Sequence, residues 1–320
     1  MKPQELSFED FFSREFPFID EPEDKTMDKK LIINVATTGA FMTRKANPNQ
    51  PFTPEEIAKE VIESYEAGAS IWHVHSRDEK GIATSDPEII KKTADIVFKE
   101  CPDIITSISA WSALGKQGAD LMRPIVDPLT VFGKEYSQMA VVIPVSQVAG
   151  PLTYLSTEET LTSIVTYLYS KGVVPEYQGF NFVAIENIKK WLIEPGVIKP
   201  PYVINAIMGT HAGVFYESHT TPYPWGLMYL MTMLENMPEG TVKGATIGGH
   251  NWLPMITAAI ILGVDLVRIG MEDTIWMYPH KPDRIESSVD VVKKVVNITK
   301  ELGREIATPN EARKILGLAK

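Results

Sequence analysis

From residue 31 onward, short apolar runs rich in β-branched residues alternate with longer segments whose apolar positions repeat with a helical period. The short runs are typical of buried strands, and the longer segments are typical of helices that cover a sheet. We predict strands at 31–36, 70–75, 103–109, 139–144, 173–177, 202–208, 242–247 and 265–270. We predict helices at 54–68, 86–100, 157–171, 183–194, 225–236, 252–263 and 286–302, with a less regular one within 112–137 and a short final one after Thr308.

This alternation of strands and helices predicts a parallel sheet, and eight strand–helix units are the number that closes a barrel. We therefore predict a (βα)8 TIM barrel that forms one catalytic domain over residues 31–320, with a polar N-terminal extension at 1–30 and a short extra helix at its end. An open doubly wound sheet is the alternative. No G-x-G-x-x-G follows the first strand, which weakens the dinucleotide-binding version of that fold.

The composition limits the classes of partner. The chain has 320 residues, 44% of them hydrophobic, and a formal net charge of -10, which argues against nucleic acid or an anionic membrane surface as a partner. Cys101 is the only cysteine, so no disulfide can form within the chain. Residues 1–30 lack the apolar segment of a signal peptide and no apolar run reaches membrane length, so we expect a cytoplasmic protein.

A TIM barrel carries its active site at the carboxyl ends of its strands. His73 and His75 stand at the end of the second predicted strand, separated by one residue, so their imidazoles should converge on one point. Neutral imidazole is a common metal ligand, and the pair therefore suggests a metal centre. Two ordinary polar residues at a strand end are the alternative.

Charged residues at the end of the eighth strand are spaced so that two of them lie on the same side of the chain. Arg268 and Glu272 point to the same side, and Glu272 could complete a metal site of two histidines and one carboxylate, with an open fourth position for substrate. Asp273 could act as a general base, with Arg268 orienting it or holding a substrate carboxylate. The alternatives are a structural ion pair at the strand end, or a cap of the next turn by Asp273.

Other polar or small residues follow the remaining strands. Gly248 and Gly249 leave backbone N–H groups beside a helix start, which suits phosphate, although two glycines also make an ordinary turn. His211 and His250 could serve as a ligand or an acid, or could simply lie near helix starts.

These residues occur within longer motifs that resemble the β-keto acid cleavage enzymes, a family that includes the 3-keto-5-aminohexanoate cleavage enzyme. The resemblance runs from about residue 31 to 318. It rests on Thr38-Gly39-Ala40, Thr53-Pro54-Glu55-Glu56, His73-Val74-His75-Ser76-Arg77-Asp78, Val174-Pro175-Glu176, Arg268-Ile269-Gly270-Met271-Glu272-Asp273 and the segment from Glu301 to Arg313.

The resemblance implies a zinc-dependent TIM barrel that converts a β-keto acid and acetyl-CoA to acetoacetate and the CoA thioester of the shortened acid. It implies that His73, His75 and Glu272 bind Zn2+, although iron or cobalt would suit the same ligands. It implies Asp273 as the base with Arg268 beside it, and a homo-oligomer, either a tetramer or a dimer. A metal-dependent aldolase or hydrolase that needs no CoA, and a non-catalytic metabolite-binding barrel, are the alternative functions. The expected substrate contacts are Thr38, Gly39, Phe41, Ser109, Glu176, Gly248 and Gly249.

Four departures from the amino-substrate members of the family line the expected mouth of the barrel. Phe41 replaces a glutamate, and a phenyl ring cannot form an ion pair with an ammonium group. The remaining three are the apolar fourth strand around Val141, the segment around Trp111 in place of a Thr-Gly-Gly turn, and Gln178 in place of an acid. We therefore predict a drier pocket and a β-keto acid with an uncharged or apolar tail.

Overall fold

Parallel strands close into a barrel in the computed structural model of the chain, which describes residues 7–9, 13, 25–109, 116–149, 152–209 and 225–318. Its strands are β1 (Ile32–Ala36), β2 (Ile71–Val74), β5 (Ile105–Ile108), β6 (Met139–Val142), β9 (Val174–Gly179), β10 (Tyr202–Met208), β11 (Thr241–Ile247) and β12 (Leu266–Ile269). They pair in the order β1-β12-β11-β10-β9-β6-β5-β2, and the circle closes between β2 and β1. The predicted barrel is confirmed, and the open sheet is excluded.

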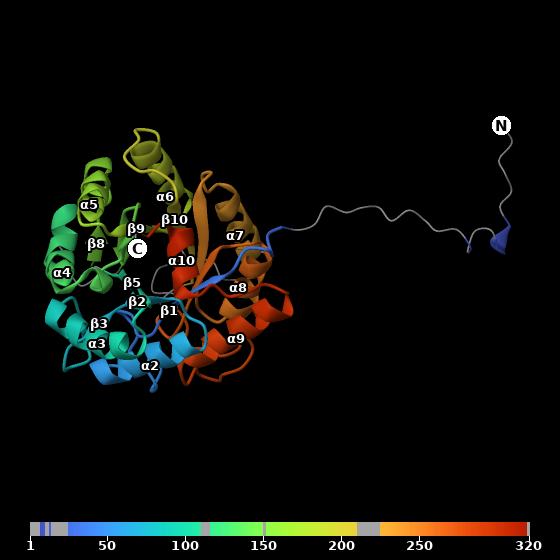
Figure 1. Ribbon diagram of the computed structural model, residues 1–320, viewed down its shortest axis with the longest axis horizontal. Coiled ribbons are helices and arrows are strands. Elements are labelled where there is room, and N and C mark those ends of the chain that lie inside the picture. Colours follow the sequence, from blue (N-terminus) through green and yellow to red (C-terminus); the bar gives the residue numbers. More distant parts are fainter. Residues whose placement is uncertain are drawn as a thin grey trace.

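Helices form a ring around these strands (Figure 1). They are α2 (Pro54–Glu66), α3 (Pro87–Glu100), α4 (Ala119–Phe132), α5 (Glu158–Ser170), α6 (Phe182–Asn187), α7 (Trp225–Glu235), α8 (Trp252–Ile261) and α9 (Ser288–Glu301), with α10 (Pro309–Leu316) added at the end. Thr53 begins α2 with the predicted capping box, in which the Thr53 side chain accepts from the Glu56 N–H and the Glu56 carboxylate accepts from the Thr53 N–H.

Two helical segments differ from the prediction. The helix expected within 112–137 is shorter, because α4 begins only after Gly118, and residues 110–115 lie outside the described residues. The helix expected at 183–194 divides into α6 and a π-helical turn at Ile188–Ile193. Apolar periodicity cannot distinguish these two helix types here, because the six residues of the π-helical segment make little more than one turn.

Two small hairpins were not predicted. One pairs β3 (Ser76–Arg77) with β4 (Ala83–Thr84), and the other pairs β7 (Gln147–Ala149) with β8 (Leu152–Tyr154). Strands of two or three residues are too short for alternation of apolar and polar positions to be recognised. Both hairpins lie in connections that follow barrel strands, so they help to build the mouth of the barrel.

The final helix closes the opposite end of the barrel. Ala312 and Leu316 of α10 are buried in one cluster with the first residues of the strands, which include Ile32 and Leu266. In Figure 1 α10 lies over the central strands, inside the ring of helices. The barrel is thus closed by side chains at its amino end, and the loops at its carboxyl end are left to form a site.

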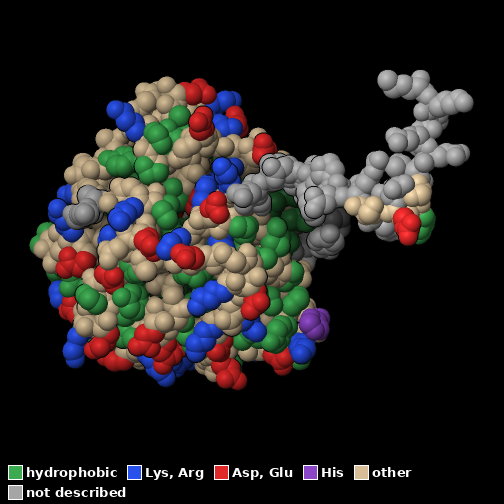
Figure 2. Space-filling model, turned by 45° about the vertical axis from the view of Figure 1, so that its right-hand side comes forward, with side chains coloured by type: hydrophobic (Ala, Val, Ile, Leu, Met, Phe, Trp, Pro, Cys, Tyr) green, Lys and Arg blue, Asp and Glu red, His purple; other side chains and the backbone are tan. Residues whose placement is uncertain are grey.

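The outer surface is mixed in charge. Acidic and basic side chains alternate over the face shown in Figure 2, and the acidic excess forms no single large patch there. Among the described residues, no helix combines the length and the apolar character that a membrane crossing needs. Most of residues 1–24 lie outside the described part, so the division of the chain at residue 30 stays a prediction.

Replacement of Leu316 by alanine tests the closure of the barrel by α10. Leu316→Ala leaves a cavity among the strand starts and should lower the free energy of unfolding by about 2–4 kcal/mol. Lys314→Ala, an exposed position on the same helix, should change it by less than about 0.5 kcal/mol. Denaturant unfolding measures both values, and equal losses in the two variants would contradict the proposed packing.

Candidate active site

Two imidazoles and one carboxylate meet at the carboxyl end of the barrel. His73 lies in β2 and His75 directly follows this strand, so both side chains leave the backbone on the same side, as their spacing predicted. Glu272 follows β12, which pairs with β1 next to β2. All three side chains are buried. Residues that are distant in the sequence are thus brought together by closure of the barrel.

The spacing of these groups fits a metal ion. The Nε2 atoms of His73 and His75 each lie 3.5 Å from Oε1 of Glu272, and ligand atoms of the three residues all lie within 4.8 Å of one another. Ligands of a tetrahedral zinc-like site stand about 2.1 Å from the metal and therefore roughly 3.4 Å apart. The cluster could therefore bind a metal ion without rearrangement of the strands.

The protonation of the cluster also suits metal binding. Burial lowers the pKa of His73, which favours the neutral ring. Nη1 of Arg268 lies 3.1 Å from Nε2 of His73, and a guanidinium can only donate, so this ring nitrogen accepts. Burial alone would raise the pKa of Glu272, but His73, His75 and Arg268 hold it well below its usual range. Neutral imidazole and ionised carboxylate are the forms that bind metals.

Gly39, in the loop after β1, lets this loop approach Glu272 closely. Its φ of +68° lies in the left-handed region that favours glycine, and a Cβ here would stand 2.4 Å from Cγ of Glu272. The Glu272 N–H donates to the carbonyl of Ala36, 3.0 Å away at the end of β1. The first loop therefore forms a wall against Glu272.

Arg268 holds Asp273 through two hydrogen bonds. Nη2 donates to Oδ1 at 2.7 Å and Nε donates to Oδ2 at 3.1 Å, a two-pronged geometry that fixes the orientation of the carboxylate. Burial raises the pKa of Asp273 to about 7, against the opposing effect of Arg268. A carboxylate with a pKa near neutrality can take a proton and return it, as a general base must.

Glu176, on β9, is a further buried carboxylate. It accepts hydrogen bonds from Ser107 on β5, from Gln178 at 3.2 Å, and from Asn205 on β10. It also raises the pKa of Arg268 and of Asp273, so it lies within electrostatic reach of both. Asn205 could not be recognised from the sequence as part of the site, because a polar residue inside an apolar strand does not reveal which neighbouring strand it faces.

Arg77 organises the loop after β1. It is buried and donates to Oγ1 of Thr38 and to the carbonyls of Gly39 and Gly81, each at 2.7 Å. Burial lowers the pKa of Arg77 to about 10, which still leaves it protonated at neutral pH. The Thr38 hydroxyl in turn donates to the carbonyl of Pro51 at 2.8 Å. Thr38 is thus fully engaged in the shape of this loop.

The remaining expected contacts lie around the same mouth. Phe41 is half-buried on the first loop, and Ser109 is buried just after β5. The N–H groups of Gly248 and Gly249 donate to the carbonyls of Met208 and Asp273, at 2.8 and 3.1 Å. They are therefore not the open phosphate donors that the glycine pair suggested. His211 and the segment around Trp111 lie outside the described residues.

A Cβ on Gly248 would stand 2.1 Å from the carbonyl oxygen of Asp273. A glycine is therefore required at position 248 for packing, which the sequence did not reveal. It lets the backbone of the expected base lie directly against the end of β11.

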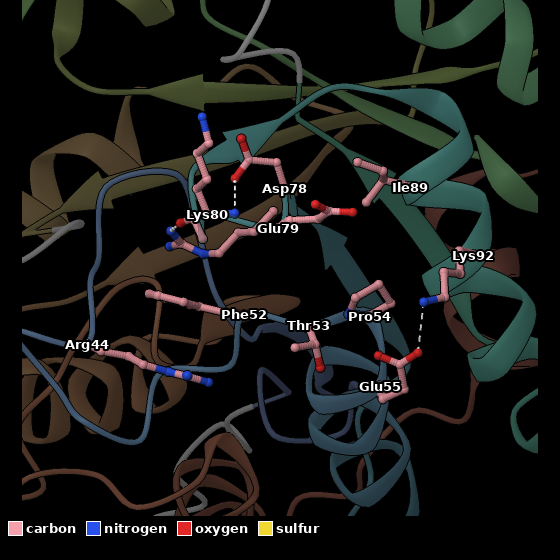
Figure 3. Close-up of a pocket in the computed structure, with 12 residues that line it drawn as sticks. Arg44, Phe52, Thr53, Pro54, Glu55, Asp78, Glu79, Lys80, Ile89 and Lys92 are labelled. Atoms are coloured by element: carbon pink, nitrogen blue, oxygen red, sulfur yellow. Dashed lines mark hydrogen bonds and ion pairs between the residues drawn. The ribbon is translucent and has the colours of Figure 1, made fainter.

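A cavity of about 470 Å³, lined in part by Arg77, lies where α2 and α3 begin beside the β3–β4 hairpin (Figure 3). Its charges are largely paired within the protein. Lys92 binds Glu55 across it at 2.9 Å, and Arg44 binds Glu56 at 2.6 Å.

The closed barrel with paired buried charges at its mouth defines a TIM-barrel protein with an enzyme-like site. The family model of the β-keto acid cleavage enzymes matches residues 30–318. The chain therefore belongs to this family and is an enzyme of the β-keto acid cleavage type, which confirms the resemblance that its motifs indicated.

Relatives with known activities support this assignment over nearly the whole chain. A 3-keto-5-aminohexanoate cleavage enzyme of Acetoanaerobium sticklandii is 33% identical over 292 residues, which cover 91% of this chain and 100% of that protein. One from Fusobacterium nucleatum is 32% identical, with coverages of 92% and 100%. A 3-dehydrocarnitine:acetyl-CoA trimethylamine transferase of Rhizobium meliloti is 26% identical, with coverages of 92% and 99%.

A solved ternary complex of ObcA with a C4-CoA adduct and oxalate shares the fold. Its TM-score is 0.68 at 17% identity, and the match covers 85% of this chain and 68% of that one. This likeness supports the barrel architecture alone.

Gly39→Ala tests the close contact between the first loop and Glu272. The added methyl group should push Glu272 out of the cluster and, if this carboxylate is a metal ligand, weaken zinc binding at least about tenfold. Gly172→Ala is a matched control, since Gly172 has φ +74° and nothing within 4 Å of its added Cβ. Zinc titration with a competing chelator measures both variants. Unchanged affinity in Gly39→Ala would show that Glu272 does not contribute to the metal site.

Proposed function

We propose that the protein cleaves a β-keto acid with acetyl-CoA, giving acetoacetate and the CoA thioester of the shortened acid, and that the reaction depends on a zinc ion. The observation that carries the proposal is that a possible metal site and an oriented carboxylate lie side by side at the mouth of the barrel. A cluster of His73, His75 and Glu272 with metal-ligand spacing lies beside a carboxylate, Asp273, that Arg268 holds in a fixed orientation. Several relatives are named as acetyl-CoA transferases of keto acids.

A zinc ion held by His73, His75 and Glu272 would polarise the keto and carboxylate oxygens of the substrate. Asp273 would remove a proton from the carbon between those two groups, and Arg268 would hold its carboxylate toward that carbon. Water is largely excluded by burial, so the interactions of these charged groups are stronger than they would be in solution.

The later steps need no reactant other than the β-keto acid and acetyl-CoA. The carbanion attacks the acetyl carbonyl of acetyl-CoA, and the CoA thiolate leaves. The thiolate then attacks the original keto carbon, and the carbon–carbon bond breaks to release the acyl-CoA product. The electron pair remains on acetoacetate, which takes the proton back from Asp273. One carboxylate thus serves as base first and as acid last.

The tail of the substrate is proposed to be uncharged or apolar. Phe41 lies half-buried on the loop that forms the wall against Glu272, and its ring offers no counter-charge. The fourth strand adds Val141, whose side chain is buried, at the same end of the barrel. Burial of an unpaired ammonium group against such a surface would be strongly unfavourable. The expected homo-oligomer and the expected cytoplasmic location stay predictions.

His75→Ala and Asp273→Asn separate the metal from the base. His75→Ala should lose the metal, measured by elemental analysis, and turnover together. Asp273→Asn should keep the metal but lower turnover by about 10²- to 10⁴-fold, because the general base is lost. Turnover is measured with a panel of β-keto acids, with and without acetyl-CoA. Cleavage that does not need acetyl-CoA would favour the aldolase or hydrolase alternative, and full activity of Asp273→Asn would refute the assigned base.

The substrate preference tests the role of Phe41. The wild-type enzyme should turn over β-keto acids with apolar tails at higher kcat/KM than 3-keto-5-aminohexanoate. Phe41→Glu should reduce this preference by roughly tenfold or more, since a carboxylate can pair with the ammonium group. Phe41→Gln, which is polar without charge, is the control. Equal or better use of the amino substrate by the wild type would contradict the proposed pocket.

A further inference from the structure

The mouth of the barrel needs a place for the charged end of acetyl-CoA, and this inference rests on the proposed function. The coenzyme carries a diphosphate and a ribose phosphate at the far end of its pantetheine arm. Arg268 and Arg77 cannot hold these groups, because both are buried and already donate to protein acceptors. Cations elsewhere on the rim must take this part.

Three side chains from two neighbouring loops pack together at the mouth. His250 follows β11, whereas Trp276 and Arg284 lie in the loop between β12 and α9. The His250 and Trp276 rings meet edge to face, with centroids 3.8 Å apart and an angle of 86° between their planes. Arg284 stacks on Trp276, with its guanidinium carbon 3.4 Å from the ring centroid. A guanidinium stacked on an aromatic face keeps its in-plane N–H groups available, and their fork suits phosphate oxygens.

Arg284 lacks an acidic partner in the described part of the chain. Its Nη1 atom is buried and has no hydrogen-bond partner there. The neighbouring acids Asp283 and Glu286 are exposed, and within the same described residues neither forms an ion pair with Arg284. The positive charge of Arg284 is therefore not compensated by a carboxylate of the described residues, which leaves it able to attract an anion.

The start of α8 adds a second attraction for anions. The indole N–H of Trp252, the first residue of α8, donates to the carbonyl of Trp276 at 2.7 Å and so fixes the stack beside this helix end. Asn251 at the N-cap makes no side-chain capping hydrogen bond. Uncapped N-terminal N–H groups and the helix dipole favour negative charge.

Two lysines extend the positive surface along the same loop. Nζ of Lys281 lies 5.1 Å from the Tyr278 ring centroid, and Nζ of Lys294, on α9, lies 4.5 Å from it. Lys294 also donates to the Tyr278 hydroxyl at 2.9 Å. The loop thus has two places where cations lie against an aromatic ring, one at Trp276 and one at Tyr278. Their number matches the two separate phosphorylated groups of CoA.

The geometry points to the cluster of His250, Trp276 and Arg284, extended by Tyr278, Lys281 and Lys294, as the binding site for the phosphates of CoA. Trp276 follows Asp273 by three residues, so their backbones lie within about 11 Å. The pantetheine arm can cover such a gap and deliver the thioester to the base. The loops after the seventh and eighth strands are also a frequent location of phosphate sites in TIM barrels.

The cavity of Figure 3 is the rival location, and its charges favour it less. Of its four cations, Arg44 and Lys92 are paired with carboxylates, Arg77 is bound to carbonyl groups, and the Lys80 ammonium alone has neither kind of partner within the described residues. The carboxylates Glu55, Asp78 and Glu79 also line it and would repel phosphate.

Binding calorimetry with two probes tests the site. Acetyl-CoA carries the phosphates, whereas acetyl-pantetheine carries the same thioester without them. Arg284→Gln and His250→Gln should each weaken binding of acetyl-CoA, by roughly tenfold or more for Arg284→Gln, and leave binding of acetyl-pantetheine unchanged. Lys293→Gln removes an exposed charge from α9 and should change neither affinity. Arg44→Gln reports on the rival cavity, and thermal unfolding confirms that each variant is folded.

The outcomes separate this inference from the proposed function. Loss of acetyl-CoA affinity in Arg284→Gln and His250→Gln but not in Lys293→Gln or Arg44→Gln, with weaker salt dependence in Arg284→Gln than in the wild type, supports the site. Normal acetyl-CoA binding in Arg284→Gln, an equal loss for both probes, or a loss only in Arg44→Gln overturns the site while the proposed function stands. Absence of acetyl-CoA binding by the wild-type protein would instead refute the proposed function.

Discussion

The site depends on the balance of charge between three buried carboxylates and the few cations that lie near them. Glu176, Glu272 and Asp273 lie around one guanidinium, that of Arg268, which binds Asp273 and contacts Glu272 at 3.4 Å. Arg77 adds positive charge nearby but is bound to loop carbonyls. Buried carboxylates repel one another unless they are paired or protonated, and this repulsion favours a further cation among them. A divalent ion at the histidines would supply that charge, while burial raises the pKa of Asp273 to about 7 and leaves this carboxylate able to accept a proton.

The barrel makes this concentration of charge possible. Its strands and the outer helices share a large apolar core, and α10 closes the amino end with Leu316 and its neighbours. The free-energy cost of burying polar groups is therefore confined to the carboxyl end of the barrel, where the loops hold these groups in place. Two close approaches, at Gly39 and Gly248, bring the loops after β1 and β11 against Glu272 and Asp273. Substrate and coenzyme would meet between these loops, with chemistry at the centre and phosphate recognition at the rim.

Much of this arrangement could be predicted from the sequence, for physical reasons. The eight strands and most helices follow from apolar periodicity, and the parallel barrel follows from their alternation. The spacing of His73 and His75, and the phase of Arg268 and Glu272, predicted which side chains converge. The long-range partners of loop residues could not be predicted. Arg77 clamps a loop some forty residues away through backbone carbonyls, and Arg284 reaches His250 only through the ring of Trp276. Neither contact follows from a local pattern, because both depend on how loops from different strands pack.

X-ray absorption spectroscopy at the zinc edge, on protein purified without chelators, tests the central claim most directly. The account predicts one zinc ion per chain with two imidazole nitrogens and one carboxylate oxygen at about 2.0–2.2 Å, and an oxygen ligand in the open position. The His75→Ala variant should give no signal from bound zinc, because it loses the metal. Fully active protein that contains no metal, or a metal bound by other ligands, would contradict the account.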